Sequence, residues 1–154
     1  MNPLAGLVYR LNRAYLWVTR PLTVGVRLIL VRDGQVLLVR HTYQDGWLLP
    51  GGGVKRGETV EAAVRREAQE EIGATLGALS LRGVYTNFFE FKSDHVVVFA
   101  CEDFELPQPQ HVQRMEIECF DFFALNELPA DLMPGHRRRL EEYQSASPAG
   151  WGRW

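Results

Sequence analysis

Apolar and polar residues alternate most clearly in two neighbouring segments of the first third of the chain. Residues 23–32 read TVGVRLILVR and residues 35–40 read QVLLVR, and both are rich in β-branched residues. Such alternation is typical of strands. Asp33 and Gly34 separate the two segments and tolerate the positive φ angles of a two-residue hairpin turn. The pattern therefore predicts two antiparallel strands.

Three later segments have the same strand-like composition. They are residues 79–91, 95–104 and 116–125, and a turn is expected at residues 92–94, between the first two. The predicted sheet thus gains at least three further strands.

Two other segments have the signals of a helix. A helix is predicted over about residues 59–72, because Thr59 is a suitable N-cap and Gly73 stands where a C-cap belongs. Pro134 opens a second helical stretch that continues to Tyr143. Since strands and helices are interleaved in one short chain, the expected fold class is α+β, with helices packed on the faces of a mixed β-sheet.

The two ends of the chain carry weaker patterns. Near the start, apolar residues recur at helical spacing, and this stripe consists of Leu4, Leu7, Val8, Leu11, Tyr15 and Val18. We expect residues 1–21 to form an amphipathic helix that packs on its own domain or on a second subunit. Residues 22–145 should form the folded domain, and residues 146–154 a flexible C-terminal tail. A targeting or membrane-surface helix is the alternative for residues 1–21.

Composition narrows the class of protein. The chain has 154 residues, a formal net charge of −2, and 46% hydrophobic and 23% charged residues, as expected for one globular domain. This charge balance disfavours a binder of nucleic-acid polymers, and no apolar stretch is long enough to span a bilayer. Cys101 and Cys119 lie in apolar stretches. We therefore expect reduced thiols, a cytoplasmic location and no membrane partner.

Three glutamates of the first predicted helix are the strongest candidates for chemistry. Glu67, Glu70 and Glu71 lie at i, i+3 and i+4, so their carboxylates fall on one face of the helix. Like charges at these spacings repel one another. A hard divalent cation such as Mg²⁺ would offset the repulsion, and Arg66 can pair with Glu70 and orient it.

The surrounding sequence resembles the signature of the Nudix hydrolases, G-x5-E-x7-R-E-U-x-E-E-x-G-U, where U is aliphatic. The fixed positions are met by Gly52, Glu58, Arg66, Glu67, Glu70, Glu71 and Gly73. Alanines, Ala68 and Ala74, stand at the two aliphatic positions. The preceding LLVR and LPGGG segments and the strand pattern also resemble this family.

This resemblance implies a fold, an activity and a set of ligands. The implied fold is a mixed β-sheet sandwiched between helices, and the implied activity is hydrolysis of a nucleoside diphosphate linked to another moiety, with Mg²⁺ or Mn²⁺. The metal ligands would be Glu67, Glu70, Glu71 and the Gly51 carbonyl, with Glu116 as an extra ligand or an ordinary exposed glutamate. Either Glu67 or a distal glutamate could act as the base. The candidate catalytic residues are thus Glu67, Glu70, Glu71 and Arg66.

Candidate substrate contacts rest on position and residue type. They are Arg40 and His41 at the end of a strand, Gly52 and Gly53 in the glycine loop, and the aromatic residues Trp47 and Tyr85. Arg40 and His41 could bind phosphates or be ordinary surface residues, and the aromatic rings could stack on a base or belong to the core.

Two functions remain open for the sequence. One is a metal-dependent pyrophosphohydrolase, and the other is a Nudix-fold module that binds or senses a nucleotide without turnover. No proline occurs between Gly73 and Pro107, which weakens the resemblance to ADP-ribose hydrolases. We therefore expect a nucleoside triphosphate or another small nucleoside diphosphate derivative as substrate.

Overall fold

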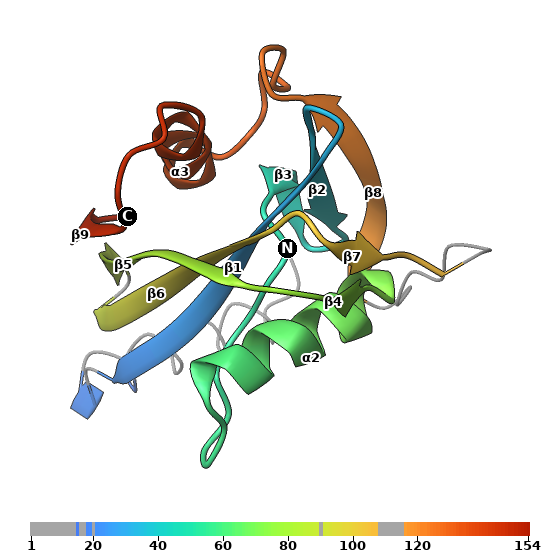
Figure 1. Ribbon diagram of the computed structural model, residues 1–154. Coiled ribbons are helices and arrows are strands. Elements are labelled where there is room, and N and C mark those ends of the chain that lie inside the picture. Colours follow the sequence, from blue (N-terminus) through green and yellow to red (C-terminus); the bar gives the residue numbers. More distant parts are fainter. Residues whose placement is uncertain (1–14, 16–17, 20, 90, 108–115) are drawn as a thin grey trace, which may run out of the picture.

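The computed structural model describes residues 15, 18–19, 21–89, 91–107 and 116–154. The strands and helices are, in chain order, β1 (Leu22–Arg32), β2 (Gln35–His41), β3 (Gln44–Leu48), α2 (Val60–Ile72), β4 (Thr75–Leu76), β5 (Ser80–Phe89), β6 (Lys92–Cys101), β7 (Phe104–Glu105), β8 (Ile117–Ala124), α3 (Pro134–Gln144) and β9 (Gly150–Arg153). Helices α2 and α3 lie on opposite sides of the main sheet (Figure 1).

The main sheet has seven strands and mixed direction. Its order is β3-β2-β1-β6-β5-β9, and β8 also pairs with β2. β1 runs parallel to β6 and antiparallel to β2, while β5 is antiparallel to β6. A separate two-stranded sheet joins β4 and β7. The predicted α+β class and the sheet between helices are confirmed.

The hairpin of β1 and β2 is predicted correctly, but the two strands pair only next to their turn. The paired residues are Val31 with Val36 and Arg32 with Gln35, and the turn has φ angles of 51° at Asp33 and 74° at Gly34. Beyond that point the strands separate, which frees one edge of β1.

The glycine loop, residues 50–54, occupies that free edge. Three backbone hydrogen bonds of 2.9 Å make the pairing: the Leu28 N–H donates to Pro50 O, the Val26 N–H to Gly52 O, and the Val54 N–H to Val24 O. The loop thus takes the place of a neighbouring strand.

Both faces of the sheet are buried because alternate residues of β1 face different helices. Val26, Leu28 and Leu30 belong to the cluster that contains the α2 residues Val64 and Ala68. Ile29 and Val31 belong to a second cluster, which contains Leu140 of α3. Side chains in the central part of β1, from Val26 to Val31, are therefore packed on both faces of the sheet.

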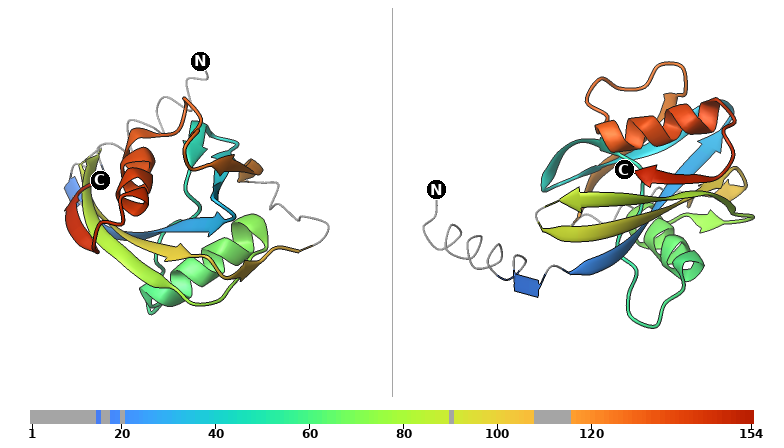
Figure 2. Two further views of the ribbon diagram at one scale, coloured as in Figure 1. Left: turned by 45° about the horizontal axis from the view of Figure 1, so that its top comes forward. Right: turned by 90° about the vertical axis from the view of Figure 1, so that its left-hand side faces the viewer.

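Two expectations differ from the structure. The turn expected at residues 92–94 lies inside β6, because Lys92 and Ser93 pair with the end of β5 and Asp94 accepts a hydrogen bond of 2.8 Å from the Thr23 hydroxyl of β1. The flexible tail expected at residues 146–154 instead contains β9, which adds in parallel to the edge of β5 (Figure 2). The small and polar residues of this segment do not predict a strand, because backbone hydrogen bonds to β5, and not an alternating side-chain pattern, hold β9 in place.

Most of the predicted N-terminal stripe lies outside the described residues. Tyr15 and Val18 are described, and their exposed fractions are 63% and 73%. The docking of residues 1–21 stays a prediction. Among the described helices, none is long and apolar enough to cross a membrane.

The pairing of the glycine loop with β1 generates a stability prediction. Gly51 has a φ of 136°, and a Cβ there would overlap with the Val26 carbonyl oxygen. A Cβ at Gly53 would meet nothing within 4 Å. We expect Gly51→Ala to lower the free energy of unfolding by about 2 kcal/mol or more, and Gly53→Ala to change it by less than about 0.5 kcal/mol. Urea unfolding of both variants checks this, and equal losses would contradict the pairing.

Candidate active site at the glycine loop

Helix α2 is capped at both ends and presents its glutamates toward the glycine loop. The Thr59 hydroxyl accepts a hydrogen bond of 3.1 Å from the Ala62 N–H, and Gly73 ends the helix with a φ of 70°. Ala68 is 1% exposed, so one side of the helix is fixed in the core. The caps and the packing together set which way the carboxylates point.

Glu71 joins this helix to the loop. Its side chain is buried, and its Oε2 accepts a hydrogen bond of 2.8 Å from the Gly51 N–H. Burial raises the pKa of Glu71 to about 7; the hydrogen bond from Gly51 and the charge of Arg27 oppose the rise, while the charges of Glu67 and Glu116 add to it. Ionising a carboxyl group at this buried position is costly. The hydrogen bond to the loop therefore does not by itself explain a negative charge here.

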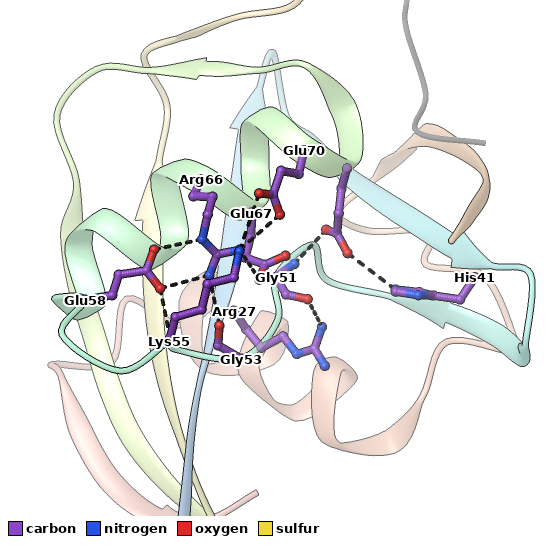
Figure 3. A network of polar contacts seen from close by, with 10 residues as sticks. Arg27, His41, Gly51, Gly53, Lys55, Glu58, Arg66, Glu67 and Glu70 are labelled. Carbon is purple, nitrogen blue, oxygen red and sulfur yellow. Dashed lines mark hydrogen bonds and ion pairs between the residues drawn. The ribbon is translucent and has the colours of Figure 1, made fainter. Parts of the chain in front are cut away.

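Two residues that the sequence analysis did not single out hold the loop from other sides. The Arg27 guanidinium of β1 donates to the Gly51 carbonyl at 2.7 Å (Figure 3). The buried Nδ1 of His136 in α3 accepts a hydrogen bond of 3.0 Å from the Leu49 N–H. Burial lowers the pKa of His136 well below its usual value, so this nitrogen stays an acceptor. In the sequence, Arg27 could have been recognised as a charged residue in the middle of an apolar strand, whereas no sequence feature points to His136.

Arg66 is the centre of a second network, on the exposed side of the loop. It makes a two-bond ion pair with Glu58, at 2.7 and 2.9 Å, and also donates to Glu67 at 2.7 Å and Glu70 at 3.0 Å (Figure 3). A further bond of 3.0 Å reaches the Gly53 carbonyl. The predicted pairing of Arg66 with Glu70 is confirmed, and the same guanidinium also pairs with the carboxylates of Glu58 and Glu67.

His41 and Glu116 lie on the Glu71 side of the loop. His41 is buried, its Nε2 is 3.6 Å from Glu71 Oε1, and burial together with the charge of Arg27 lowers its pKa. The Glu116 carbonyl accepts a bond of 2.9 Å from the Thr42 N–H, and its exposed carboxylate is close enough to affect the pKa of Glu71. Both residues therefore lie near Glu71, while the predicted roles of His41 as a phosphate contact and of Glu116 as a ligand or base stay predictions.

The other predicted substrate contacts have internal partners. Arg40 forms an ion pair of 2.6 Å with Asp131 and lies 4.9 Å from the centre of the Trp47 ring. Tyr85 is buried, and its hydroxyl donates to Glu142 of α3 at 2.7 Å. Trp47 and Tyr85 therefore pack in the α3 cluster, while Gly52 and Gly53 stand in the loop as expected.

The donor atoms at the loop suit a hard divalent cation, although they are not gathered as a metal site. Within the described ranges no group of three or more His, Cys, Asp or Glu side chains has a metal-binding arrangement. Arg66 holds oxygens of Glu67 and Glu70, while Glu71 points to Gly51. A Cβ at Gly52 would lie 2.6 Å from Glu67 Oε1, so glycine at this position leaves room for that carboxylate. The carboxylate and carbonyl oxygens are of the type that Mg²⁺ or Mn²⁺ prefers, and the cation would stabilise the ionised form of Glu71.

Comparison with known proteins shows the family of this chain. The NUDIX domain family matches residues 19–143. An ADP-ribose pyrophosphatase of Methanocaldococcus jannaschii is 35% identical over 78% of this chain and 72% of its own. An RNA pyrophosphohydrolase of Aeromonas hydrophila is 39% identical, but the match spans only 45% of this chain and 39% of that relative.

Solved structures give the same result. The crystal structure of a MutT NUDIX hydrolase from Burkholderia pseudomallei has a TM-score of 0.71 and 32% identity, and the match covers 78% of this chain and 96% of that one. A NUDIX hydrolase from Nitrosomonas europaea, 20% identical with a TM-score of 0.73 over 82% of this chain and 90% of that one, shares the fold.

The Arg66 network generates a prediction about pH and stability. Hydrogen bonds from Arg66 and the Lys55 N–H lower the pKa of Glu58 from 4.5 to about 2. Because the folded-state pKa is the lower one, this contribution to stability is present above pH 4.5 and is lost as the pH falls toward 2. We expect Glu58→Gln to be less stable than the wild type at pH 7, and the difference to shrink at pH 3.

Urea unfolding at both pH values checks this prediction. Glu61→Gln is the matched control, since Glu61 is an exposed glutamate in the first turn of α2 and its ion pair within the described residues is with Arg65. A deficit of Glu58→Gln that is equal at the two pH values would show that Arg66 does not hold the Glu58 carboxylate in solution.

Proposed function

This chain belongs to the Nudix family of pyrophosphohydrolases, and we propose that it hydrolyses a nucleoside diphosphate linked to another moiety, with Mg²⁺ or Mn²⁺ as cofactor. The observation that carries the proposal is the buried Glu71, which accepts from the Gly51 N–H of the glycine loop and has a pKa raised to about 7. A neutral acceptor such as glutamine would satisfy the Gly51 N–H without the cost of a buried charge. The retention of a carboxylate there, beside Glu67 and Glu116, favours a role in holding a cation.

The residues that would hold the metal are Glu67, Glu70 and Glu71, with the Gly51 carbonyl and Glu116. The bound cation would supply positive charge that stabilises the phosphoryl oxygens during attack by water. Glu67 and Glu70 would have to exchange their bonds with Arg66 for bonds to the metal.

The remaining steps belong to the protein's own groups. The oxygen of a water molecule forms a bond to phosphorus, the P–O bond of the anhydride breaks, and a carboxylate takes the proton of the water. Glu67 and Glu116 are the two candidates for this base. Arg66 is a positioning residue, because its hydrogen bonds hold Glu67 and Glu70 beside the loop before a metal binds, and its ion pair with Glu58 would remain afterwards.

The proposed substrate is a nucleoside triphosphate or another small nucleoside diphosphate derivative. The name of the Methanocaldococcus jannaschii relative makes ADP-ribose the main competing substrate.

The proposed site of action is the cytoplasm. Cys101 and Cys119 are both free thiols, which supports this location.

A substrate panel tests the activity. We expect magnesium-dependent release of phosphate or a nucleoside monophosphate from a panel of nucleoside triphosphates, ADP-ribose and 5′-triphosphorylated RNA, with a nucleoside triphosphate turned over best. Faster hydrolysis of ADP-ribose or of the RNA would contradict the proposed substrate. Tight binding without any turnover would instead favour a nucleotide-sensing module.

A single substitution tests the role of Glu71. Glu71→Gln keeps an oxygen that can accept from the Gly51 N–H but removes one negative charge. We expect turnover to fall by on the order of 10³-fold, which corresponds to about 4 kcal/mol of barrier, while the melting temperature stays the same or rises. Kinetics and thermal unfolding check both parts, with Glu61→Gln as the control. A Glu71→Gln protein with near-normal, magnesium-dependent turnover would contradict the assignment.

A further inference from the structure

Two neighbouring cavities lie on the α3 side of the sheet, and the larger adjoins the glycine loop. The larger has a volume of about 340 Å³ and is lined by β1, β6 and the backbone of Gly52 and Gly53. The smaller, of about 270 Å³, lies toward α3 and includes Met133 and His136 in its lining. Together they have the size of a small-molecule site.

Three residues line both cavities: Arg27, Asn87 and Trp154. Trp154 follows β9 and lies outside residues 19–143, the part of the chain that matches the NUDIX domain. Its backbone N–H donates to the Thr86 carbonyl at 3.0 Å, and its ring makes an edge contact with His136 at 5.0 Å between centroids. A Cβ at Gly135 would overlap with the indole, so the ring is held closely against α3.

Asn87 contributes a polar group to the shared wall. It lies on β5 opposite Asp94 of β6, and no hydrogen bond to its carboxamide occurs within the described part of the chain. A carboxamide has two donors and one acceptor oxygen. It can therefore bond to the polar edge of a planar ring that enters the cavities.

Gly25 provides space in the larger cavity. Its φ is not positive, so the backbone does not require glycine. An added Cβ would make only ordinary contacts, 3.4 Å from Gly52 O and 4.0 Å from Asp94 Oδ1. Glycine weakens the interior of a strand, and it often marks a place where a ligand comes close to the backbone. The missing side chain leaves room between the loop and Asp94.

The neutral groups of the lining indicate which part of a nucleotide fits. The larger cavity is lined by charges of both signs, Arg27, Lys92 and Asp94, and the Arg27 guanidinium already donates to the Gly51 carbonyl. The Trp154 indole and the Asn87 carboxamide suit a neutral ring that carries donors and acceptors. The glycine loop separates these groups from the α2 carboxylates, since Gly52 lines the larger cavity and also lies against Glu67. A ligand seated in the cavity can thus extend its phosphates across the loop toward Glu67.

We propose that the two cavities form one site for the nucleoside part of the substrate, in which the base packs against the Trp154 indole and bonds to the Asn87 carboxamide. This inference rests on the proposed hydrolysis of a nucleoside diphosphate derivative. The strand β9 then has a function, because it positions Trp154, an aromatic lining residue that lies outside the segment matched by the NUDIX domain.

Binding of nucleosides without phosphate or metal tests the site independently of turnover. We expect adenosine, guanosine, cytidine or uridine, added in the presence of EDTA, to shift the NMR signals of the Trp154 indole N–H and the Asn87 carboxamide. Gly25→Val fills the larger cavity and should abolish the shifts while the protein stays folded. Absence of any shift with all four nucleosides, or equal shifts in Gly25→Val, would overturn the proposal.

Kinetics then separates base recognition from catalysis. For the best nucleoside triphosphate, we expect Asn87→Ala and Trp154→Leu to raise KM by about tenfold or more with kcat changed less than about threefold. Inhibition by inorganic tripolyphosphate, which has no base, should be unchanged. Trp151→Leu is the matched control, because Trp151 lies on the same strand and is 90% exposed.

The outcomes distinguish the two proposals. If Trp154→Leu fails to fold, Asn87→Ala and Gly25→Val carry the test. Nucleoside binding that depends on Gly25 in a protein without turnover would support the site and contradict the proposed hydrolysis. Normal hydrolysis in which the variants leave KM unchanged, or weaken tripolyphosphate and nucleotide equally, would overturn the site alone.

Discussion

The hydrogen bond between the buried Glu71 carboxylate and the Gly51 N–H is the interaction on which the geometry of the site depends. The glycine loop pairs with the free edge of β1, which gives it a register, but this pairing does not connect it to α2. Glu71 makes that connection from inside the protein, and Arg66 adds one at the surface through the Gly53 carbonyl. The Arg27 guanidinium donates to the Gly51 carbonyl, so side chains hold both backbone polar groups of this residue.

This arrangement places different chemistry on the two sides of one backbone segment. On the α2 side, carboxylates lie close together, and Arg66 partly neutralises them. On the α3 side, the larger cavity is lined by Gly52 and Gly53 of the loop and by Asn87 and Trp154. Gly51 permits this close approach because a Cβ there would overlap with the Val26 backbone, and a Cβ at Gly52 would displace the Glu67 carboxylate. A charged group and a neutral ring of one substrate could thus be held at a fixed separation.

The sequence predicted those parts of the protein whose causes are local. The capped helix α2 and the Asp33–Gly34 turn both follow from neighbouring residues, and both agree with the structure. Contacts that depend on tertiary packing were missed. His136 and Trp154 reach the loop region only because α3 and β9 fold back over the sheet, and no local pattern indicates this. Tyr85 was selected as a base contact for its aromatic ring, but packing against α3 occupies it.

Metal binding by the folded protein tests most directly whether Glu71 both fixes the loop and holds a cation. Electron paramagnetic resonance of free Mn²⁺ can measure the affinity of the wild type and of Glu71→Gln. We expect saturable binding to the wild type and at least about tenfold weaker binding to Glu71→Gln, with an unchanged or higher melting temperature. Equal Mn²⁺ affinity of the two proteins would contradict a role for Glu71 as a ligand and would leave it only its bond to the loop.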